Sequence, residues 1–378
     1  MTFDTAAARP TVDTRPAVFD TIAVVGGGSW GTALALTAWR AGRRVRLWAR
    51  EEHVVDAVAR DRRNPFLPHA DIPDDVLVTN AMEEALSGAD LVVLVSPSQH
   101  LRTVVRRVEP LLGADVPVVI CAKGIERDTG LLMSEVIEAV MPGREMAVLS
   151  GPTFAGEVAH DMATGVTVAA AEDGFRDGRF HDGHLAARVA VTFASESFRP
   201  YVSDDVRGVE IGGAAKNVIA IACGVAEGLG LGSNARAMII TRGLAEITEL
   251  GLAVGARLET LLGLAGAGDL MLTCSSTQSR NFSYGKALGA GETAVRRADG
   301  PVVEGAENAQ SVVALARRLG VPMPVCETVL AMLDGAPVNA AMKGLMLADL
   351  HPEAVGARDD WTTPHPARIE EEEERLSA

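Results

Sequence analysis

The sequence predicts an α/β protein, with a Rossmann-type doubly wound sheet domain followed by an all-helical C-terminal domain. Between residues 21 and 203, short β-branched runs alternate with helical stretches, which is the pattern of βαβ units and a parallel sheet. A glycine-rich turn directly follows the first of these runs. After about residue 206 the strand-like runs stop, and long Ala/Leu/Ile-rich helical stretches continue to about residue 348.

The strands are expected at residues 21–26, 44–49, 76–79, 90–95, 116–122 and 146–150, with 165–171 and 198–203 extending one edge of the sheet. Helices are expected between most strands, notably at residues 31–41 and 100–112. Two longer stretches that contain proline, 62–73 and 150–159, are expected to be site loops.

The helical part is expected to be broken by glycine turns at residues 228–232, 263–268 and 289–291. The domain limits follow from these patterns. We expect a flexible extension over residues 1–19, a dinucleotide-binding domain over 20–205, a helical substrate and catalytic domain over 206–348, and an acidic flexible tail over 349–378, in which Glu370–Glu374 are consecutive glutamates.

Composition limits the class of function. The 378 residues are 48% hydrophobic and 22% charged, as in ordinary globular proteins. The 35 basic and 50 acidic residues give a net charge of −15, which argues against a nucleic-acid partner. An anionic substrate would therefore need a local basic site.

The cysteines and the apolar runs indicate a soluble cytoplasmic protein. Cys121, Cys223, Cys274 and Cys326 are far apart and form no C-x-x-C pair, which argues against a zinc site or a disulfide framework. Apolar runs such as 91–95 have strand length, so no membrane span is expected. Residues 1–16 lack the apolar core of a secretory signal.

Gly26, Gly28 and Gly31 form a G-x-G-x-x-G pattern between a strand and a helix. The first glycine allows the tight turn, the second lets the backbone approach a pyrophosphate, and the third lets helix and strand pack closely. The start of the helix would then face the phosphate charge. In this context the pattern predicts dinucleotide binding, against the alternative of a purely structural glycine turn.

The end of the second strand bears on the choice of cofactor. Arg50 follows that strand at the position where an acid would bind the ribose of NAD, and an arginine suits the 2′-phosphate of NADP(H). The sequence thus slightly favours NADP(H). Glu51 and Glu52 follow directly, so NAD(H) stays open, and Arg50 could also be an ordinary surface residue.

Two lysines are candidate catalytic residues. Lys123 follows a strand at the carboxyl edge of the sheet, where ligands bind in open α/β folds, although a lysine there is often only solvated. Lys216 lies on a helical face whose neighbours three and four positions away are Gly212, Gly213, Ile219 and Ala220. A lysine desolvated there near other cations would have a lowered pKa and could move a proton, and the alternative is that it reaches solvent.

A third segment, 263–289, combines a glycine-rich turn with Asp269 and the triplet Ser279, Arg280 and Asn281. The planar fork of arginine matches phosphate oxygens, and serine and asparagine add neutral hydrogen bonds. Asp269 could hold a lysine in position. The alternative is a capped helix start with a surface arginine.

Taken together, these segments resemble the bacterial NAD(P)-dependent sn-glycerol-3-phosphate dehydrogenases from about residue 21 to 348. The resemblance is carried by GGGSWGTALA, NPFLP, VSPSQHLR, AKGIE, LSGPTFAGEVA, EIGGAAKNVIAIACGVAEGLGLGSNARAMIITRGLAE, GLAGAGDLMLTC, QSRN and VVEGAENA, in family order. It implies reversible reduction of dihydroxyacetone phosphate to sn-glycerol 3-phosphate for phospholipid synthesis, and a homodimer.

The resemblance also implies residue roles. Lys216 would be the catalytic proton acceptor, assisted by Lys123 and Asp269. The cofactor would be contacted by Gly26, Gly28, Ser29, Trp30, Gly31, Arg50, Lys123, Ala155, Arg280, Val302 and Glu304. The substrate would be contacted by Lys123, Gly151, Thr153, Lys216, Asn217, Asp269, Ser279, Arg280 and Asn281.

The chain departs from the family pattern at a few positions. Phe66 stands where the family commonly has tyrosine, and Glu51 where a second basic residue is frequent. Residues 172–187 form a longer segment than usual, expected to enlarge a surface loop. A β-hydroxyacid or ketopantoate-type reductase would share the first loop but not SGPTFA and QSRN together, and an inert NAD(H)-binding regulator would not need the lysines or the triplet.

Overall fold

The computed structural model describes residues 17–171, 175–176, 179–180, 184–292 and 303–347. They form two compact units: residues up to Lys123 with Leu131–Glu210, and Gly124–Gly130 with the residues from Ile211 onward. Most of the expected extension, the acidic tail with Glu370–Glu374, and parts of 172–187 lie outside the described residues. The expected limits of the two domains stay a prediction.

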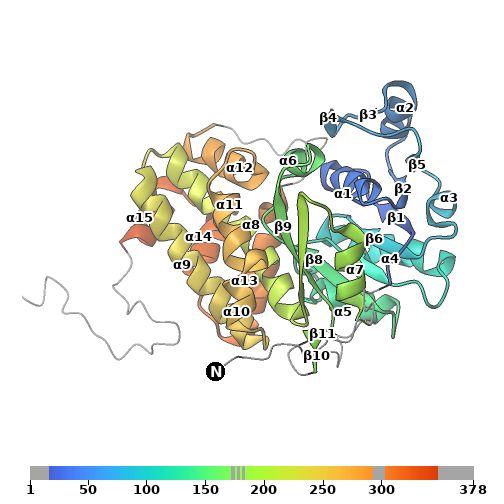
Figure 1. The fold of residues 1–378 in the computed structure, drawn as a ribbon. Helices are drawn as coiled ribbons and strands as arrows, with labels where there is room; N and C mark the ends of the chain where they lie inside the picture. Colours follow the sequence, from blue (N-terminus) through green and yellow to red (C-terminus); the bar gives the residue numbers. More distant parts are fainter. Residues whose placement is uncertain (1–16, 172–174, 177–178, 181–183, 293–302, 348–378) are drawn as a thin grey trace, which may run out of the picture. The chain divides into compact units, whose positions relative to one another are not determined.

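The first unit is built on an eight-stranded sheet in the order β12-β9-β8-β7-β6-β1-β2-β5 (Figure 1). The strands are β1 (Thr21–Val25), β2 (Arg44–Trp48), β5 (Leu77–Thr79), β6 (Leu91–Leu94), β7 (Val118–Ile120), β8 (Met146–Ser150), β9 (Thr164–Ala169) and β12 (Phe198–Ser203). Every strand predicted for the sheet is present. One pair departs from a purely parallel sheet, because β8 and β9 are antiparallel.

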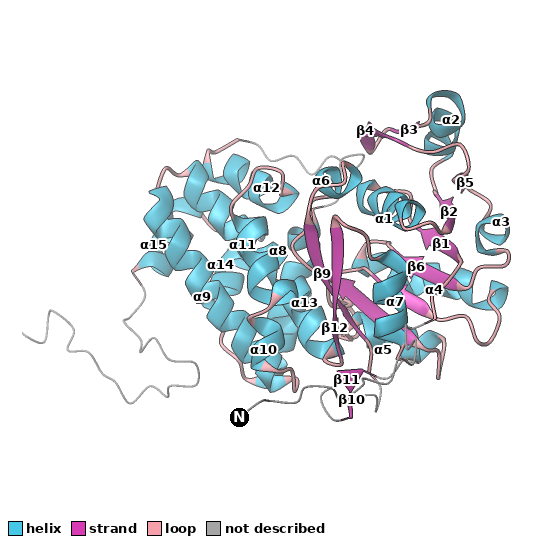
Figure 2. Cartoon of the chain, in the orientation of Figure 1, coloured by secondary structure: helices cyan, strands magenta, loops and turns pink. Residues whose placement is uncertain are grey.

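The strand order explains the two helical layers. From β1 the chain moves outward to β2 and β5, then returns to β6 and moves outward the other way to β7 and β8. Right-handed connections place the helices of these two directions on opposite faces. Accordingly α4 (Leu101–Val108) and α5 (Met133–Val140), which follow β6 and β7, pack beside each other, apart from α1 (Ser29–Arg40), which follows β1. Helices α6 (Ala155–Ala159) and α7 (Leu185–Phe193), which come after β8, where the strand direction reverses, pack beside α1. Figure 2 shows these helices around the sheet.

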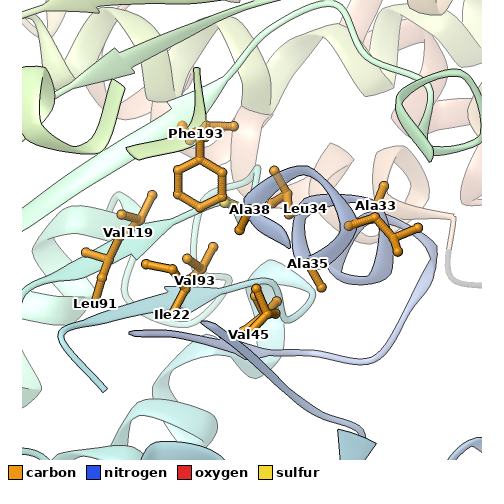
Figure 3. Close-up of a cluster of buried hydrophobic side chains, with 14 of the residues drawn as sticks. Ile22, Ala33, Leu34, Ala35, Ala38, Val45, Leu91, Val93, Val119 and Phe193 are labelled. Atoms are coloured by element: carbon orange, nitrogen blue, oxygen red, sulfur yellow. The ribbon is translucent and has the colours of Figure 1, made fainter. Parts of the chain in front are cut away.

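The core of this unit lies between the sheet and α1. Strands covered on both faces are apolar throughout, and all five residues of β1 are buried. Ile22, Val93 and Val119 lie close to Leu34 and Phe193 in this cluster (Figure 3). The packed strands and α1 hold the loop that joins them in a fixed position.

The Pro-containing stretch 62–73, expected to be a loop, forms a small antiparallel hairpin. Its strands are β3 (Arg63–Asn64) and β4 (Leu67–Asp71), and they follow α2 (Glu52–Asp61). The hairpin is closed at its base by a hydrogen bond from the Ile72 N–H to the Arg62 carbonyl, 2.8 Å long. Within 172–187, β10 (Phe175–Arg176) and β11 (Arg179–Phe180) also pair as an antiparallel hairpin.

The second unit is helical in its described residues, as the sequence predicts. The α-helices from α8 onward are α8 (Val206–Gly228), α9 (Gly232–Ala253), α10 (Leu258–Leu261), α11 (Asp269–Cys274), α12 (Arg280–Gly289), α13 (Glu304–Leu319), α14 (Pro324–Leu333) and α15 (Val338–Met346). The short α3 (Met82–Leu86) belongs to the first unit. Residues 263–268, expected to be a glycine turn, instead contain one turn of π-helix, η3 (Leu264–Gly268). A side chain at Gly266 would lie 1.9 Å from the Leu261 carbonyl oxygen, so glycine lets this turn close tightly.

Helix α8 is the core of the second unit. Among the described residues it is the one helix long and apolar enough to cross a membrane by length and composition, and that apolar window is 100% buried inside the protein. Its neighbours are protein segments, as expected for the central helix of a packed domain.

Glycines on α8 and α12 bring the backbones of these two helices into contact. A Cβ at Gly224 would lie 2.0 Å from the Phe282 carbonyl oxygen, and one at Gly228 would lie 2.2 Å from that of Lys286. On α12, a Cβ at Gly285 would lie 2.1 Å from the Ile221 carbonyl oxygen of α8. Each helix therefore presents small residues four positions apart, and the start of α12 is held close to the middle of α8.

Two buried glutamates cap helices that begin elsewhere in the chain. Glu210 accepts hydrogen bonds from the backbone N–H and the hydroxyl of Ser134, both 2.7 Å long, at the start of α5. Glu246 accepts from the Val325 N–H at 2.5 Å and the Cys326 N–H at 3.2 Å, at the start of α14. Burial raises the pKa of each carboxyl from 4.5 to about 7, although these hydrogen bonds favour the charged form.

We expect Gly285→Ala to destabilise the protein, because the new methyl group would overlap the α8 backbone. The free energy of unfolding should fall by about 1–3 kcal/mol or more. The matched control is Gly344→Ala in α15, where a Cβ would meet nothing within 4 Å. That change should be neutral or stabilising by up to about 1 kcal/mol, since alanine favours helix. Equal effects of the two changes in urea unfolding would contradict the close packing.

We also expect Glu246 to make stability depend on pH. Its pKa is higher in the folded chain, so the folded state binds the proton more tightly, and this contribution is complete below about pH 4.5 and is lost as pH rises through about 7. Compared with Glu246→Gln, the wild type should lose on the order of 3 kcal/mol between about pH 5 and about pH 8. Parallel stability curves for the two proteins would show that the Glu246 carboxyl does not titrate in this range.

Candidate active site

The glycine loop of the first unit has three glycines with different tasks. Gly26 has φ +136°, and a Cβ there would lie 2.6 Å from the Val95 carbonyl oxygen. A Cβ at Gly31 would lie 1.8 Å from the Gly26 carbonyl oxygen. At Gly28, by contrast, a Cβ would meet nothing within 4 Å. The protein's own packing therefore requires Gly26 and Gly31, whereas Gly28 leaves space that a ligand can use.

The start of α1 suits an anion. Gly28 is its N-cap residue, no side chain caps the helix, and its first turn contains no acidic residue. The N–H groups of a first helical turn have no partner within the helix, and they attract phosphate. The loop thus fits the pyrophosphate of a dinucleotide.

Ser29 and Trp30 occupy the first turn of α1. The Ser29 hydroxyl donates a 2.7 Å hydrogen bond to the carbonyl oxygen of Phe66 in the β3–β4 hairpin. Trp30 is half-buried and packs against the hydrophobic core of the unit. A tryptophan is tolerated in this loop because the glycines form the tight backbone, while the indole rests partly on the core.

The residues after β2 form an ion pair. The Arg50 side chain is 70% exposed, and its Nη2 lies 2.6 Å from Glu51 Oε1. Glu51 is also the N-cap residue of α2. The arginine that favours NADP(H) therefore lies against one of the acids that leave NAD(H) open.

A second group of candidate residues lies at the ends of β7 and β8. Lys123 Nζ donates to the Gly151 carbonyl oxygen at 3.4 Å, and Thr153 Oγ1 donates to the same oxygen at 3.3 Å. Gly151 has φ +153°, and a Cβ there would approach Val166 Cα to 2.9 Å, so only glycine fits. Ala155 begins α6 nearby in the chain. The structure brings Lys123, Gly151 and Thr153 together, and their contacts with ligands stay a prediction of the resemblance.

Lys216 and Asp269 form a buried ion pair in the second unit. Lys216 Nζ lies 2.7 Å from Asp269 Oδ1 and donates a 2.8 Å hydrogen bond to Thr273 Oγ1. The side chains of Lys216 and Asp269 are 8% and 1% exposed. The alternative that Lys216 reaches solvent is therefore wrong. Asp269 holds this lysine in position, as the sequence analysis suggested, whereas the group at hydrogen-bond distance is this carboxylate and not one of the other cations considered there.

The helix starts around this pair explain its position. Asp269 is the first residue of α11, directly after η3. Helix α8 comes close to η3 at Gly212, where a Cβ would lie only 2.6 Å from the Ala265 carbonyl oxygen, so glycine permits the approach. Asp269 and Thr273 are four residues apart and share one face of α11. Their side chains can therefore both reach the amine of Lys216.

A network of polar side chains includes Asn217, the residue that follows Lys216 in α8. Asn281 Nδ2 donates to Asn217 Oδ1 at 2.9 Å, and Asn217 Nδ2 donates to Glu304 Oε2 at 3.2 Å. Asn281 Oδ1 accepts from the Gly305 N–H at 2.8 Å. The network ties α8, α12 and α13 together, and because Asn217 follows Lys216 directly, it fixes the stretch of α8 that carries the lysine.

Ser279, Arg280 and Asn281, at the start of α12, have different surroundings. The Ser279 hydroxyl caps the helix by accepting from the Phe282 N–H at 3.3 Å, which is the alternative that the sequence left open. Arg280 is exposed at the first position of α12, and Asn281 is buried. Val302, another of the expected cofactor contacts, lies outside the described residues.

The surroundings of the cysteines do not favour a reactive thiolate, because a thiolate needs an exposed or electropositive environment. All four are free and buried. Burial raises the pKa of the Cys121 thiol to about 12 and holds the pKa of the Cys274 and Cys326 thiols well above their usual range.

The sequence analysis did not identify two side chains, Thr273 and Asn64, that hold parts of the candidate site. Thr273 had a usable signal, since it lies one helical turn after Asp269. Asn64 lies in the NPFLP segment, but its contacts with Gly27 and Thr32 could not be predicted, because they cross from a hairpin that the sequence did not predict.

A glycine loop between the first strand of a parallel sheet and an uncapped helix start is a feature of proteins that bind dinucleotides. Matches to two family models identify the family within this class. The model described as NAD-dependent glycerol-3-phosphate dehydrogenase N-terminus matches residues 21–175, and the corresponding C-terminus model matches residues 205–343. The chain belongs to this NAD-dependent glycerol-3-phosphate dehydrogenase family.

Individual relatives agree with this assignment. The chain is 52% identical to a glycerol-3-phosphate dehydrogenase [NAD(P)+] of Rhodospirillum rubrum, over 89% of this chain and 95% of that protein. It is 46% identical to a protein of the same name from Caulobacter vibrioides, over 89% and 99% of the two chains.

Solved structures extend the comparison to the fold. A glycerol-3-phosphate dehydrogenase of Coxiella burnetii is 37% identical, with a TM-score of 0.81 over 87% of this chain and 99% of that one. A ketopantoate reductase of Ralstonia eutropha is 16% identical with a TM-score of 0.55, a likeness of fold alone. The reductases that we weighed as rivals thus share the architecture, and the family models separate this chain from them.

The glycine loop yields a paired prediction. Gly28→Ala should leave the melting temperature nearly unchanged, because its Cβ has open space, but should raise the Kd of the cofactor about tenfold or more, since the methyl group enters the ligand's approach. Gly31→Ala should lower the melting temperature, because its Cβ overlaps the Gly26 carbonyl. Calorimetry and cofactor titration of both variants test this. Unchanged cofactor affinity in Gly28→Ala would remove Gly28 from the binding loop.

Proposed function

We propose that this protein catalyses the reversible reduction of dihydroxyacetone phosphate to sn-glycerol 3-phosphate with a nicotinamide cofactor. Support comes from the family to which the chain belongs and from the names of its relatives. The observation that carries the proposal is the buried amine of Lys216, held by Asp269 and Thr273.

Reduction of a ketone requires a proton at the oxygen that becomes an alcohol. Lys216 would donate this proton to the C2 oxygen and remove it in the reverse direction. Asp269 and Thr273 fix the amine within a buried region, where a positioned charge acts more strongly than in water. The bound nicotinamide would supply or accept the hydride.

Residues of the first unit would hold the cofactor and polarise the carbonyl. The loop of Gly26, Gly28 and Gly31, with Ser29 and Trp30, would bind the dinucleotide along the start of α1. Lys123, next to Gly151 and Thr153, would add positive charge near the substrate oxygen and touch both ligands. Ala155, at the start of α6, would contact the cofactor.

The start of α12 would hold the substrate phosphate. The exposed guanidinium of Arg280 can form two parallel hydrogen bonds with phosphate oxygens, and the helix start adds N–H groups. Asn281 would contribute as part of the network with Asn217 and Glu304, which fixes its amide. Ser279 would act by starting the helix at this point.

The preference between cofactors would depend on Arg50 and Glu51. An arginine after β2 can bind the 2′-phosphate of NADPH, and its pairing with Glu51 at 2.6 Å must be given up or shared for that contact. We therefore propose use of both cofactors with a modest preference for NADPH. A homodimer, a role in phospholipid synthesis and a cytoplasmic location stay predictions of the family resemblance.

The test measures the oxidation of NADPH by the purified protein with and without dihydroxyacetone phosphate, and the same oxidation of NADH in parallel. The wild type should turn over with both cofactors. Lys216→Gln, which can still donate a hydrogen bond to Asp269, should lower kcat by about 10²–10⁴-fold. We choose glutamine over alanine because alanine would leave the buried Asp269 carboxylate without its cation and would destabilise the fold.

The matched control is Lys343→Gln, at an exposed lysine on α15. Its kcat should stay within about twofold of the wild type, as for surface changes far from a site. Absence of turnover in folded wild type that binds cofactor would contradict the substrate assignment. Normal turnover in Lys216→Gln would remove Lys216 from proton transfer.

A further inference from the structure

The β3–β4 hairpin is joined to the glycine loop by one buried side chain. Asn64 is 0% exposed, and its amide nitrogen donates to the Gly27 carbonyl oxygen at 2.8 Å and to Thr32 Oγ1 at 2.7 Å. Its own Oδ1 accepts from the Phe66 N–H at 2.9 Å. Both amide protons and the amide oxygen are therefore in use, which fixes the orientation of the side chain.

Thr32 continues the connection to the next peptide. Its hydroxyl accepts from Asn64, so the hydroxyl proton is available for another acceptor, and it donates to the Gly28 carbonyl oxygen at 2.9 Å. The Thr32 N–H donates to the same oxygen at 3.0 Å. Thr32 is 1% exposed, so these contacts are shielded from water.

These bonds hold two consecutive carbonyl groups of the loop. A trans peptide is planar, and its N–H points opposite to its C=O. The Gly27 carbonyl therefore sets the direction of the Gly28 N–H, and the Gly28 carbonyl sets that of the Ser29 N–H. Both N–H groups belong to the start of α1, where a pyrophosphate would bind.

Glycines make such a hold necessary. Gly26, Gly27 and Gly28 are consecutive, and glycine peptides have more rotational freedom than any others. If the loop were free, a ligand would have to order it on binding, and affinity would fall by that entropy. The Asn64–Thr32 pair places this ordering in the fold before the ligand arrives.

We propose that Asn64 and Thr32 are positioning residues for cofactor binding: they orient the Gly28 and Ser29 N–H groups toward the pyrophosphate of the dinucleotide. This rests on the proposed function in that the ligand is a nicotinamide dinucleotide. Neither residue needs to touch the cofactor. The β3–β4 hairpin thereby serves as the support of the glycine loop.

The experiment measures the Kd of NADH by fluorescence titration of the full-length protein, together with kcat and the KM of dihydroxyacetone phosphate at saturating NADH. Asn64→Ala should raise the Kd of NADH about tenfold, because the Gly27 carbonyl loses its side-chain donor and the Thr32 hydroxyl loses the hydrogen bond that orients it. Once NADH is saturating, kcat and the substrate KM should stay within about threefold, since the hold acts on the dinucleotide loop. A merely structural role would lower the melting temperature without this separation.

Thr32 provides the second pair of variants. Thr32→Val removes the hydroxyl with little change in shape and should weaken NADH binding, whereas Thr32→Ser keeps the hydroxyl and should retain it. The matched control is Asp71→Asn, which removes the 2.9 Å ion pair between Arg63 and Asp71 on the same hairpin. Both of its partners are mostly exposed, so NADH binding should be unchanged.

The outcomes separate this proposal from the proposed function. If Asn64→Ala does not fold, the Thr32 pair carries the test. Wild-type Kd for NADH in Thr32→Val, or equal weakening in Thr32→Ser, would overturn the proposal. If the wild type binds NADH but does not reduce dihydroxyacetone phosphate, the substrate assignment fails, while the NADH titrations still decide the role of Asn64 and Thr32.

Discussion

The burial of a lysine amine in the helical unit is the constraint on which the arrangement of that unit depends. Removing an ammonium group from water is costly unless an anion and further hydrogen bonds compensate for it. Lys216 obtains both from Asp269 and Thr273, and these must come from a helix that begins against α8. The π-helical turn before Asp269 and the glycines that let it close against α8 provide this arrangement. The small residues around Lys216 are therefore explained by backbone contact, and the lysine by the charge placed opposite it.

The same physical device recurs in the two units. In each, glycines bring backbone segments within reach of each other, and one or two buried polar side chains then fix what the glycines leave free. In the helical unit, Gly224 and Gly285 bring α8 and α12 together, and Asn217 and Asn281 join across that contact. In the sheet unit, the glycine loop is held by Asn64 and Thr32. Close approach and orientation are thus supplied by different residues.

Buried carboxylates show that this protein uses anions for structure as well as for chemistry. Glu210 and Glu246 reach across to the starts of α5 and α14, where the N–H groups otherwise lack acceptors. Their raised pKa values reflect the cost of keeping a charge away from water. Asp269 differs because its partner is a cation, so the charges of the pair offset each other. A carboxylate paired with N–H groups stabilises a helix, and one paired with an amine holds a candidate catalytic group.

The sequence by itself determined the eight strands of the sheet, the change to helices near residue 206, and most of the candidate residues. These are local properties: strand and helix periodicity, and glycines next to a strand, are readable in short windows of sequence. Only the tertiary structure decided that Lys216 faces Asp269 and Thr273, that Ser279 caps α12, that residues 62–73 form a hairpin, and that Asn64 holds the glycine loop. The physical reason is that each of these contacts joins segments that are distant in sequence or depends on the side to which a side chain turns. No local pattern records such a pairing, because it exists only once the packed backbone has brought the partners within hydrogen-bond distance.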